Sequence, residues 1–307
     1  MQAVTPRVSI VIPHYNQVEC LKVLLPSIAN QTFTDYEVII IDDCSLDKSV
    51  VEYIKSFIKD YKNMRLIENA ENMRFIKTVN RGIGLSNGEY ICLLNSDTEV
   101  KKNFVERNVE ILDADASIAG LSCIIVDKYN QNWWTGGGIH VAFPVNLTDD
   151  FEGLRRVDFV AGTAAFYRKE VFDKIGLFDE SFRMYHEDVD FGLRIRAETN
   201  YKTCAFSDRL VVHYNIKAIP GPEATYLLSR NQILIARRYF PKFLPLAILK
   251  YLIDKTKPLA NDILGLHPWL FLVDALQCGR GIGRIFGALL NNPSRIPRLS
   301  GTRDGQL

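Results

Sequence analysis

The alternation of short apolar strands with helical patterns along the first 113 residues constrains the fold of this chain most strongly. The spacing of apolar residues predicts strands over 8–13, 36–43, 64–68 and 90–95 and, after each of them, a helix around 21–28, 50–61, 74–85 and 103–113. Consecutive strand–helix units imply a parallel sheet with helices on both faces. We expect Asn16 and Ser45 to cap the first two helices and Pro26 to kink or stop the first.

The remainder of the chain predicts a continuation of this domain followed by a helical extension. An irregular, aromatic and glycine-rich stretch over 133–138 precedes strand and turn signals at 157–168, a short helix at 169–175 and a last strand at 210–214. After Pro220-Gly221-Pro222 the pattern is helical throughout, which predicts a boundary there. We therefore expect an α/β domain over 1–220 and a helical extension over 221–307.

Length and charge limit the classes of function. A chain of 307 residues that is 47% hydrophobic can form one large α/β domain plus an extension. Its formal net charge of +1 indicates no nucleic-acid partner. Residues 230–307 hold 12 Lys and Arg against 4 Asp and Glu, a net charge of +8, and the totals of 37 and 36 leave −7 for residues 1–229. The body is acidic and the extension is basic.

Cysteine usage and the N-terminus favour a cytoplasmic location. The six cysteines are scattered, form no C-x-x-C pair and lie mostly in apolar runs, which is typical of buried thiols in a reducing compartment. The chain enters its first strand without the basic and long apolar segments of a signal peptide. No run reaches the roughly 18 apolar residues of a membrane span.

The densest cluster of charge lies in the segment MYHEDVDFGLRIR, Met184 to Arg196. Its charged residues are interleaved with large apolar ones, which predicts a short buried helix whose acids face a cavity. Buried carboxylates cost free energy unless they are partnered. These acids therefore have a functional task or form a structural salt-bridge cluster, and we expect Arg194 to pair with an acid of this helix and Asp190 to be structural.

Acids, amides and an aromatic residue follow the first, second and fourth predicted strands. Ligands of open parallel sheets bind beyond this edge. The residues are Pro13, Tyr15, Asn16, Asp42, Asp43, Asn95, Ser96 and Asp97. Neither G-x-G-x-x-G nor G-x-x-x-x-G-K-[ST] is present, which argues against a dinucleotide dehydrogenase and a P-loop phosphotransferase. Carboxylates here can bind a base, a ribose or a divalent cation, or only cap helices.

Several runs occur in the order found in one enzyme family. They are VSIVIPHYN, VIIIDDCS, NRGIGLSNGEYICLLNSDTEV, VDFVAGTAAFYRKEVFDKIGLFDE and HEDVDFGLRIR. Over about residues 7–240 the chain resembles the inverting glycosyltransferases of family 2, which have the GT-A fold and use nucleotide-sugar donors. The runs GLFDE and EDVDFGLR look most similar to soluble, rhamnosyltransferase-like members. The resemblance implies a nucleotide-sugar-binding half over 1–100 and an acceptor and catalytic half over 101–220.

The resemblance also implies roles for the residues that match the family's motifs. Nucleotide-sugar binding falls to Pro13, Tyr15, Asn16, Asp42 and Asp43. Asn95-Ser96-Asp97 matches the D-x-D site, in which Asp97, together with His213 from the last strand, would hold Mg²⁺ or Mn²⁺ on the donor diphosphate. Asp188 matches the catalytic base and Glu187 its neighbour, and a buried apolar setting should raise the pKa of this base.

Two residues depart from the family's pattern. Asn95 stands where many relatives have the first Asp of D-x-D, so we expect weaker metal binding. Arg74 stands where the pattern N-x-G-F has glycine, and its side chain could narrow the pocket or contact the donor. Ser96 lies between Asn95 and the expected metal ligand and is included with the donor-binding residues.

The acceptor side and the extension suggest partners beyond the donor. Trp133 and Trp134, beside three glycines, could stack on a sugar acceptor or only pin a turn to the core. The basic, amphipathic helices after residue 220 could dock on the inner face of the cell membrane and bring the site to a polyprenyl-linked glycan. A helical cap on the sheet and a homodimer interface are the alternatives.

The sequence therefore predicts a metal-dependent, inverting transfer of a sugar from a dTDP- or UDP-linked donor to a glycan hydroxyl, in surface polysaccharide assembly. One alternative, raised by Asn95, is a catalytically silent protein of the same fold that binds a sugar nucleotide or glycan. A nucleotidyltransferase is a second alternative, but the glycine-rich, basic phosphate loop expected near its first strand is missing from His14-Tyr15-Asn16-Gln17.

Overall fold

The computed structural model describes residues 5–129, 131–140, 142–214 and 221–252. The chain divides into two compact units, the first formed by Met1–Gly138 with Asn146–Asn231 and the second by Ile139–Val145 with Gln232–Leu307. The division falls inside a long helix that begins at Gly221, so the domain boundary expected after residue 220 stays a prediction. Residues 253–307, most of the expected extension, lie outside the described part.

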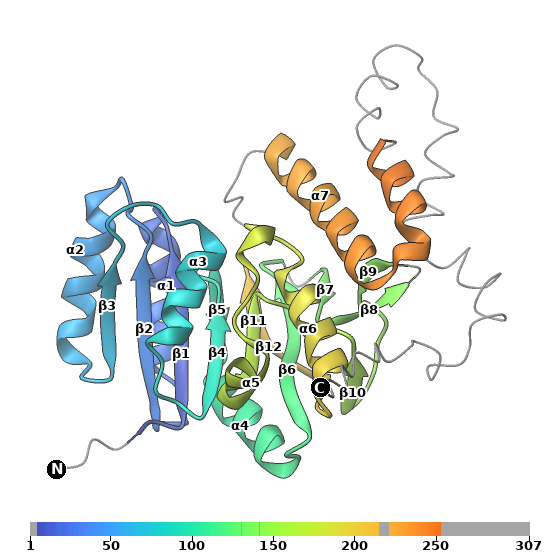
Figure 1. The fold of residues 1–307 in the computed structure, drawn as a ribbon. Helices are drawn as coiled ribbons and strands as arrows, with labels where there is room; N and C mark the ends of the chain where they lie inside the picture. Colours follow the sequence, from blue (N-terminus) through green and yellow to red (C-terminus); the bar gives the residue numbers. More distant parts are fainter. Residues whose placement is uncertain (1–4, 130, 141, 215–220, 253–307) are drawn as a thin grey trace, which may run out of the picture. The chain divides into compact units, whose positions relative to one another are not determined.

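The strand–helix alternation expected for the first 113 residues is present. Its elements are β1 (Val8–His14), α1 (Val18–Ala29), β2 (Tyr36–Asp42), α2 (Lys48–Phe57), η1 (Ile58–Asp60), β3 (Met64–Glu68), α3 (Phe75–Gly84), β4 (Tyr90–Leu94), β5 (Thr98–Val100) and α4 (Phe104–Ala114). The strands β3, β2, β1 and β4 lie side by side in that order and are parallel (Figure 1). Their carboxyl ends therefore meet at one edge of the sheet, as the sequence predicted.

The second half of the first unit extends the same sheet with mixed strand directions. Its elements are β6 (Ile118–Asp127), β7 (Trp133–Trp134), β10 (Leu154–Val157), β11 (Ala164–Arg168), α5 (Lys169–Ile175), η2 (Glu180–Phe182), α6 (Glu187–Glu198), β12 (Lys202–His213) and the start of α7 (Gly221–Tyr239). Strand β11 lies antiparallel between β4 and β6, whereas β12 is parallel to β6. The antiparallel β10 is the edge strand beside β12. The result is a mostly parallel α/β sheet.

Helices cover both faces of this sheet because its central strands are apolar on both sides. Ile10 and Ile12 of β1 belong to the core shared with α1, α2 and α4. Val11 points to the other face, where α3 approaches so closely that a Cβ on Gly82 would lie 2.4 Å from Val11 Cγ1 and 2.5 Å from Ile41 Cδ1. Glycine at position 82 therefore permits the packing of α3, which carries one wall of the site.

The caps expected for the first two helices are wrong. Helix α1 follows Gln17, whose side chain makes no capping bond, and α2 is capped by Asp47, which accepts a hydrogen bond from the Ser49 N–H. Asn16 instead accepts hydrogen bonds from backbone N–H groups of the next loop, and Ser45 donates to Asp42. The short polar side chains join neighbouring loops rather than cap helices.

Two further expectations differ in extent. Pro26 lies inside α1, which continues to Ala29 rather than stopping early. Strand β12 begins at Lys202 rather than at residue 210, and its pairing with β6 has register shifts between Ala205 and Val211. These irregularities break the period-2 apolar pattern, which explains why only the end of this strand was predicted from sequence.

The second unit contains residues of the two-stranded sheet formed by β8 (Gly137–His140) and β9 (Phe143–Asn146), and the end of α7. A short 3₁₀ turn, η3 (Pro241–Phe243), precedes helical residues 244–252. A small apolar cluster joins Ala142, Ala236 and Ala247. No helix within the described ranges combines the length and apolar character needed to cross a membrane.

The cysteines of the described ranges are free thiols. They are Cys20, Cys44, Cys92, Cys123 and Cys204, and four of them are buried. Burial raises the pKa of the Cys20 thiol to about 11, with a smaller contribution from the charge of Asp97. Burial also raises the pKa of Cys92, Cys123 and Cys204, so these four buried thiols stay protonated at neutral pH and are poor nucleophiles. Cys278 lies outside the described residues.

Candidate functional site

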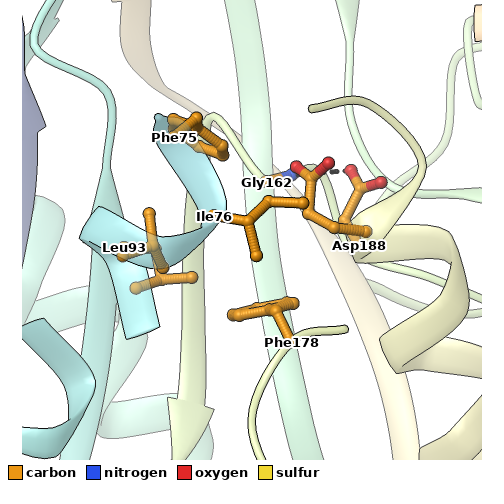
Figure 2. A pocket seen from close by; sticks show the side chains of 8 residues that line it. Phe75, Ile76, Leu93, Gly162, Phe178 and Asp188 are labelled. Atoms are coloured by element: carbon orange, nitrogen blue, oxygen red, sulfur yellow. Dashed lines mark hydrogen bonds between the residues drawn. The ribbon is translucent and has the colours of Figure 1, made fainter. Parts of the chain in front are cut away.

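Glu187 and Asp188, the first two residues of α6, line a small cavity in the first unit. The cavity is otherwise lined by Phe75, Ile76, Val79, Leu93, Gly162 and Phe178. Figure 2 shows the Asp188 carboxylate at the rim of this mostly apolar wall, with a hydrogen bond to Gly162. The prediction that the acids of this helix face a cavity is confirmed for these two residues.

Backbone N–H groups orient the Asp188 carboxylate. The Gly162 N–H donates to Oδ2 at 3.0 Å, and the Val189 N–H donates to Oδ1 at 2.8 Å. Burial raises the pKa of Asp188, and these two hydrogen bonds partly offset that rise. Within the described ranges, no Lys, Arg or His ion pair engages this carboxylate. Asp188 is therefore an oriented carboxylate whose proton affinity is increased by its surroundings.

Glu187, unlike Asp188, has one carboxylate oxygen without a hydrogen-bond partner among the described residues. That oxygen is the buried Oε2. Burial, followed by the negative charge of Asp188, raises the pKa of Glu187. The pair therefore favours a state in which Glu187 keeps its proton and Asp188 carries the charge.

Asp190 and Arg194 of α6 form the ion pair that the sequence predicted. Arg194 donates to Asp190 Oδ2 at 3.0 Å, and Asp190 is fully buried. The same guanidinium donates to the carbonyl oxygens of Ile175 at 2.8 Å and Leu177 at 2.7 Å. This pair therefore ties α6 to the turn that leads into Phe178, which forms part of the cavity wall.

The position of α6 depends on a close contact with the backbone around Phe159. A Cβ on Gly192 would lie 2.3 Å from the carbonyl oxygen of Asp158 and 2.8 Å from Phe159 Cα. Both neighbours are backbone atoms, so no side-chain rearrangement could make room. Because Gly162 lies a few residues further along the same segment, this contact helps to bring its N–H to Asp188.

Asn80 joins α3 to the same wall. Its Nδ2 donates to the carbonyl oxygen of Phe178 at 2.9 Å, and its Oδ1 accepts from the Phe178 N–H at 3.1 Å. The Phe178 ring also packs against that of Phe191 of α6, with the ring centroids 4.7 Å apart. The cavity wall is thus fixed from two sides.

Asp97 and His213, the two residues expected to bind a metal, lie together. His213 Nε2 is 3.0 Å from Asp97 Oδ1. Strand pairing explains the contact, because β5 is antiparallel to the end of β12 with His213 opposite Thr98. The described residues contain no group of three or more His, Cys, Asp or Glu side chains arranged to hold a metal ion. A carboxylate oxygen and an imidazole nitrogen are suitable donors for a divalent cation, so the pair fits part of such a site.

The tryptophans predicted to contact an acceptor form β7, which pairs with β6. Trp134 packs edge-on against His213 with ring centroids 5.6 Å apart. Trp133 faces the Arg209 guanidinium at 5.6 Å. Both indoles are only partly buried, and Trp134 lies beside the candidate metal ligands. The acceptor role of the tryptophans stays a prediction.

The residues expected to bind the nucleoside are tied into a network between loops. Asp42 is buried and accepts hydrogen bonds from the backbone and side chain of Ser45. Ser45 Oγ in turn accepts from the Asn16 N–H at 2.7 Å. Tyr15 is 40% exposed and Pro13 is partly exposed. The loop after β1 therefore presents Tyr15 to solvent while Asp42 and Asn16 stabilise the loops.

Asp43 already accepts several hydrogen bonds. Asn69 Nδ2 and the Met73 N–H donate to its Oδ1 at 2.7 and 2.8 Å, and the Arg74 N–H donates to Oδ2 at 2.9 Å. A carboxylate oxygen can accept more than one bond, so Oδ2 keeps capacity for a ribose hydroxyl or a base. The observed role of Asp43 is to hold the turn that begins α3.

Arg74 occupies a backbone conformation that normally requires glycine. Its φ of 69° and ψ of 169° fall in a region that costs about 1–3 kcal/mol for other residues. Its side chain reaches Glu223 of α7, with Nη1 3.3 Å from Oε1. This departure from N-x-G-F therefore has a physical cost, which is consistent with a task for the guanidinium.

Strained backbone is concentrated in the loops that surround the candidate site. Apart from Ala142, every non-glycine residue with positive φ in the described ranges lies in one of four segments: Asn16–Gln17, Cys44, Arg74 and the loop Arg183–His186. The first three segments follow β1, β2 and β3, and the last precedes Glu187. Such conformations persist where the surrounding structure holds them, often at functional sites.

The turn after β4 holds Asn95, Ser96 and Asp97. The Asn95 N–H donates to the Thr163 carbonyl oxygen at 2.9 Å, and Thr98 Oγ1 donates to the Asn95 carbonyl oxygen at 2.7 Å. Asn95 and Ser96 are both partly exposed. The turn is thereby linked to the segment next to Gly162.

Several residues that shape the site were not predicted. They are Asn69, Asn80, Gly162, Gly192 and Asn231. Asn80 gave a signal, since it lies on the same helical face as Ile76, Val79 and Ile83, where a polar residue must find partners. Gly162 gave none, because its importance comes from a contact with a residue 26 positions away.

Comparison with known proteins identifies the family. A family model described as glycosyl transferase family 2 matches residues 9–176, more than half of the chain. The chain belongs to this family. The amylovoran biosynthesis glycosyltransferase AmsB of Erwinia amylovora is 30% identical over 192 residues, which cover 61% of this chain and 62% of AmsB. The chain spans less than two thirds of the length of the first curated relatives that it matches.

Solved structures of glycosyltransferases share the fold of this family member. TarS 1–349 of S. aureus in complex with UDP-GlcNAc aligns with a TM-score of 0.55 and 19% identity, over 81% of this chain and 72% of that chain. GalNAc-T7 with UDP, GalNAc and Mn²⁺ aligns with a TM-score of 0.63 and 17% identity, over 79% and 49%. The predicted GT-A fold is confirmed.

Proposed function

We propose that this protein is a glycosyltransferase that moves a sugar from a nucleoside diphosphate donor to a hydroxyl acceptor with inversion at the anomeric carbon. The observation that carries the proposal is the Asp188 carboxylate, which lines the cavity and is oriented by two backbone N–H groups. Membership in glycosyl transferase family 2 supports the reaction class.

Asp188 acts as the general base in this proposal. The acceptor hydroxyl becomes a competent nucleophile as its proton passes to Asp188 in the transition state, a contribution of about 10²–10⁴-fold. The raised pKa makes the carboxylate a better proton acceptor, and the Gly162 N–H keeps Oδ2 in a fixed direction. A protonated Glu187 beside it avoids a second negative charge. Attack from the face opposite the leaving group inverts the anomeric centre.

Asp97 and His213 would hold a divalent cation, Mg²⁺ or Mn²⁺, on the donor. When bound, such a cation neutralises the negative charge that builds on the leaving diphosphate. The contact between Asp97 and His213 supports this assignment, and Asn95 supplies a neutral carbonyl where an anionic ligand is usual in the family. Water and phosphate oxygens would complete the ligand set.

The donor and acceptor classes are proposed from the relatives. UDP is named with both TarS and GalNAc-T7, which supports a UDP- or dTDP-linked donor held by Pro13, Tyr15, Asn16, Asp43 and Arg74. The name of AmsB refers to amylovoran biosynthesis, which supports a glycan or polyprenyl-linked glycan acceptor in polysaccharide assembly. A rhamnosyl donor remains the sequence prediction.

The test measures transfer and stereochemistry directly. The full chain is incubated with UDP-, dTDP- and GDP-linked sugars, a hydroxyl acceptor and Mn²⁺ or Mg²⁺, and the anomeric configuration of the product is read by NMR. We expect release of nucleoside diphosphate and an inverted product. Retention of configuration contradicts the role of Asp188, pyrophosphate release indicates a nucleotidyltransferase, and donor binding without turnover indicates a silent binding protein.

Membrane docking by the basic helices is a second part of the proposal. Within the second unit, Phe243, Ile248, Leu249 and Leu252 expose 37–53% of their surface, with Lys250 among them. Apolar and cationic residues together favour an anionic lipid interface. Truncation after residue 229 would cut α7, so the appropriate variants are Leu249→Glu with Leu252→Glu. Loss of co-sedimentation with anionic vesicles supports docking, and binding equal to that of the unaltered chain contradicts it.

A further inference from the structure

Asn231 of α7 makes an unusual set of contacts with the backbone that leads into the catalytic helix. Its side chain is fully buried. Its Nδ2 lies 3.0, 2.8 and 2.7 Å from the carbonyl oxygens of Phe182, Met184 and Tyr185. One amide group thus places its two hydrogens among three carbonyl oxygens of a single short segment, which ends at Tyr185, two residues before Glu187.

The segment that Asn231 binds is one that does not hold its own shape easily. Arg183, Tyr185 and His186 have positive φ angles of 65°, 69° and 63°. Residues other than glycine adopt this conformation at a cost, and it persists only where neighbouring groups stabilise it. His186 is also the residue directly before α6, so the conformation of this loop sets where the helix begins.

Neighbouring groups fix the orientation of the Asn231 amide. Arg230 Nη1 donates to Asn231 Oδ1 at 2.7 Å and to the Ser181 carbonyl oxygen at 2.8 Å. Because a guanidinium can only donate, the atom facing Arg230 is the oxygen, and the NH₂ group faces the loop. Arg230 and Asn231 together hold the backbone from Ser181 to Tyr185.

We propose that Asn231 is a positioning residue for sugar transfer, which holds the loop 182–186 so that Asp188 meets the acceptor hydroxyl. This inference rests on the proposed function, since it assigns Asn231 a part in the same reaction. Asn231 acts through the loop rather than on the substrate. Through Asn231, α7 becomes part of the active site, although that helix supplies none of the reacting groups.

The chemistry of the site explains why asparagine is suited to this position. Carbonyl oxygens that lose a donor cost free energy. An alanine at position 231 would remove the Asn231 donor from the Met184 and Tyr185 carbonyl oxygens, whereas the Phe182 oxygen would keep its bond from the Met184 N–H at 2.8 Å. Aspartate has the same shape but presents an oxygen in place of the NH₂ group. The pair of variants therefore separates loss of the donor from loss of side-chain volume.

Asn108 of α4 offers a matched control. It is also fully buried, and its Nδ2 donates to a backbone carbonyl oxygen, that of Phe104, at 2.8 Å. Phe104 belongs to α4 itself, so this bond does not reach the loop before α6. Asn108→Ala removes a buried amide of the same kind without touching the 182–186 loop.

The experiment compares Asn231→Ala, Asn231→Asp and Asn108→Ala in the full chain. For both position-231 variants we expect kcat for transfer to fall about 10²-fold, the cost of a misplacement of about 1 Å, while KM for the donor is unchanged. We also expect faster amide hydrogen exchange over residues 183–188. Asn108→Ala should lower thermal stability with neither effect.

Each arm can overturn the inference. If the activity of Asn231→Ala falls no more than that of Asn108→Ala at equal fractions folded, Asn231 is only structural. If KM rises and kcat does not fall, it serves donor binding. Should the wild-type chain transfer no sugar, the proposed function fails, but the exchange measurement still decides, because unchanged protection in the Asn231 variants contradicts the hold on the loop. Should the alanine variant not fold, Asn231→Asp supplies the same comparison.

Discussion

Gly192→Ala tests whether the close packing of α6 positions the reacting carboxylate. The added Cβ would lie 2.3 Å from the Asp158 carbonyl oxygen and 2.8 Å from Phe159 Cα. Ordinary contact between such atoms lies near 3.5 Å, so helix and backbone must separate by about 1 Å. The Gly162–Asp188 hydrogen bond, now 3.0 Å, joins the same two segments and would lengthen.

We expect this change to reduce both stability and turnover. Overpacking of this kind costs about 1–3 kcal/mol of unfolding free energy, and misplacement of a reacting group by about 1 Å lowers the rate about 10²-fold. Denaturant unfolding and steady-state transfer kinetics measure the two effects separately. A folded Gly192→Ala protein with wild-type kcat would refute the reasoning.

Gly84→Ala is the matched control for this substitution. Gly84 is the last residue of α3, and nothing lies within 4 Å of the Cβ it would gain. Alanine there should raise stability by about 0.5–1 kcal/mol, because glycine loses more backbone freedom on folding. Its kcat should equal that of the wild type, so loss of activity in both variants would point to a general effect of the added methyl group.

The remaining predictions concern charge, strain and metal binding. Because the pKa of Glu187 is raised in the folded state, the unfolding free energy should fall as pH rises from about 4.5 through the raised value. Glu187→Gln should remove this pH dependence. Parallel plots of unfolding free energy against pH for the variant and the wild type would contradict the prediction. Arg74→Gly should stabilise the protein by about 1 kcal/mol, because the backbone strain it relieves outweighs the loss of an exposed ion pair with Glu223. Calorimetry measures the gain in stability. A raised KM for the donor would show that the guanidinium contributes to donor binding. His213→Ala should raise the Mn²⁺ concentration needed for half-maximal activity, and an unchanged titration would exclude it as a ligand of that ion.

The sequence was sufficient for the elements whose pattern is local. The spacing of apolar residues in the first half predicted β1 to β4 and their helices because β1, β2 and β4 are buried on both faces and each helix on one. The placement of Tyr15, Asp43 and Asp97 after the carboxyl ends of the neighbouring strands β1, β2 and β4 followed from the parallel arrangement. The pairing of Asp190 with Arg194 was predictable from their i, i+4 spacing.

The features that sequence reasoning missed depend on contacts between distant segments. Asn16 is a residue type that often caps helices, but its side-chain oxygen accepts a hydrogen bond from the loop after β2. This partner is determined by the tertiary structure. Asn231 is one polar residue in an amphipathic helix, and its partners lie 46 to 49 residues away. The sequence does not show why position 192 needs glycine, because the reason is the close approach of the backbone at Asp158 and Phe159. Such residues hold neighbouring segments in place, and they leave no periodic pattern in the sequence.

Asp188→Asn measures the central claim most directly. Asparagine keeps the shape and can still accept the Gly162 hydrogen bond, but it cannot take a proton from the acceptor. We predict that kcat for sugar transfer falls by about 10²–10⁴-fold, with donor binding by calorimetry unchanged. Asp173→Asn, an exposed acid on α5, serves as the control and should retain full activity. Transfer by Asp188→Asn at the wild-type rate would contradict the account of this protein.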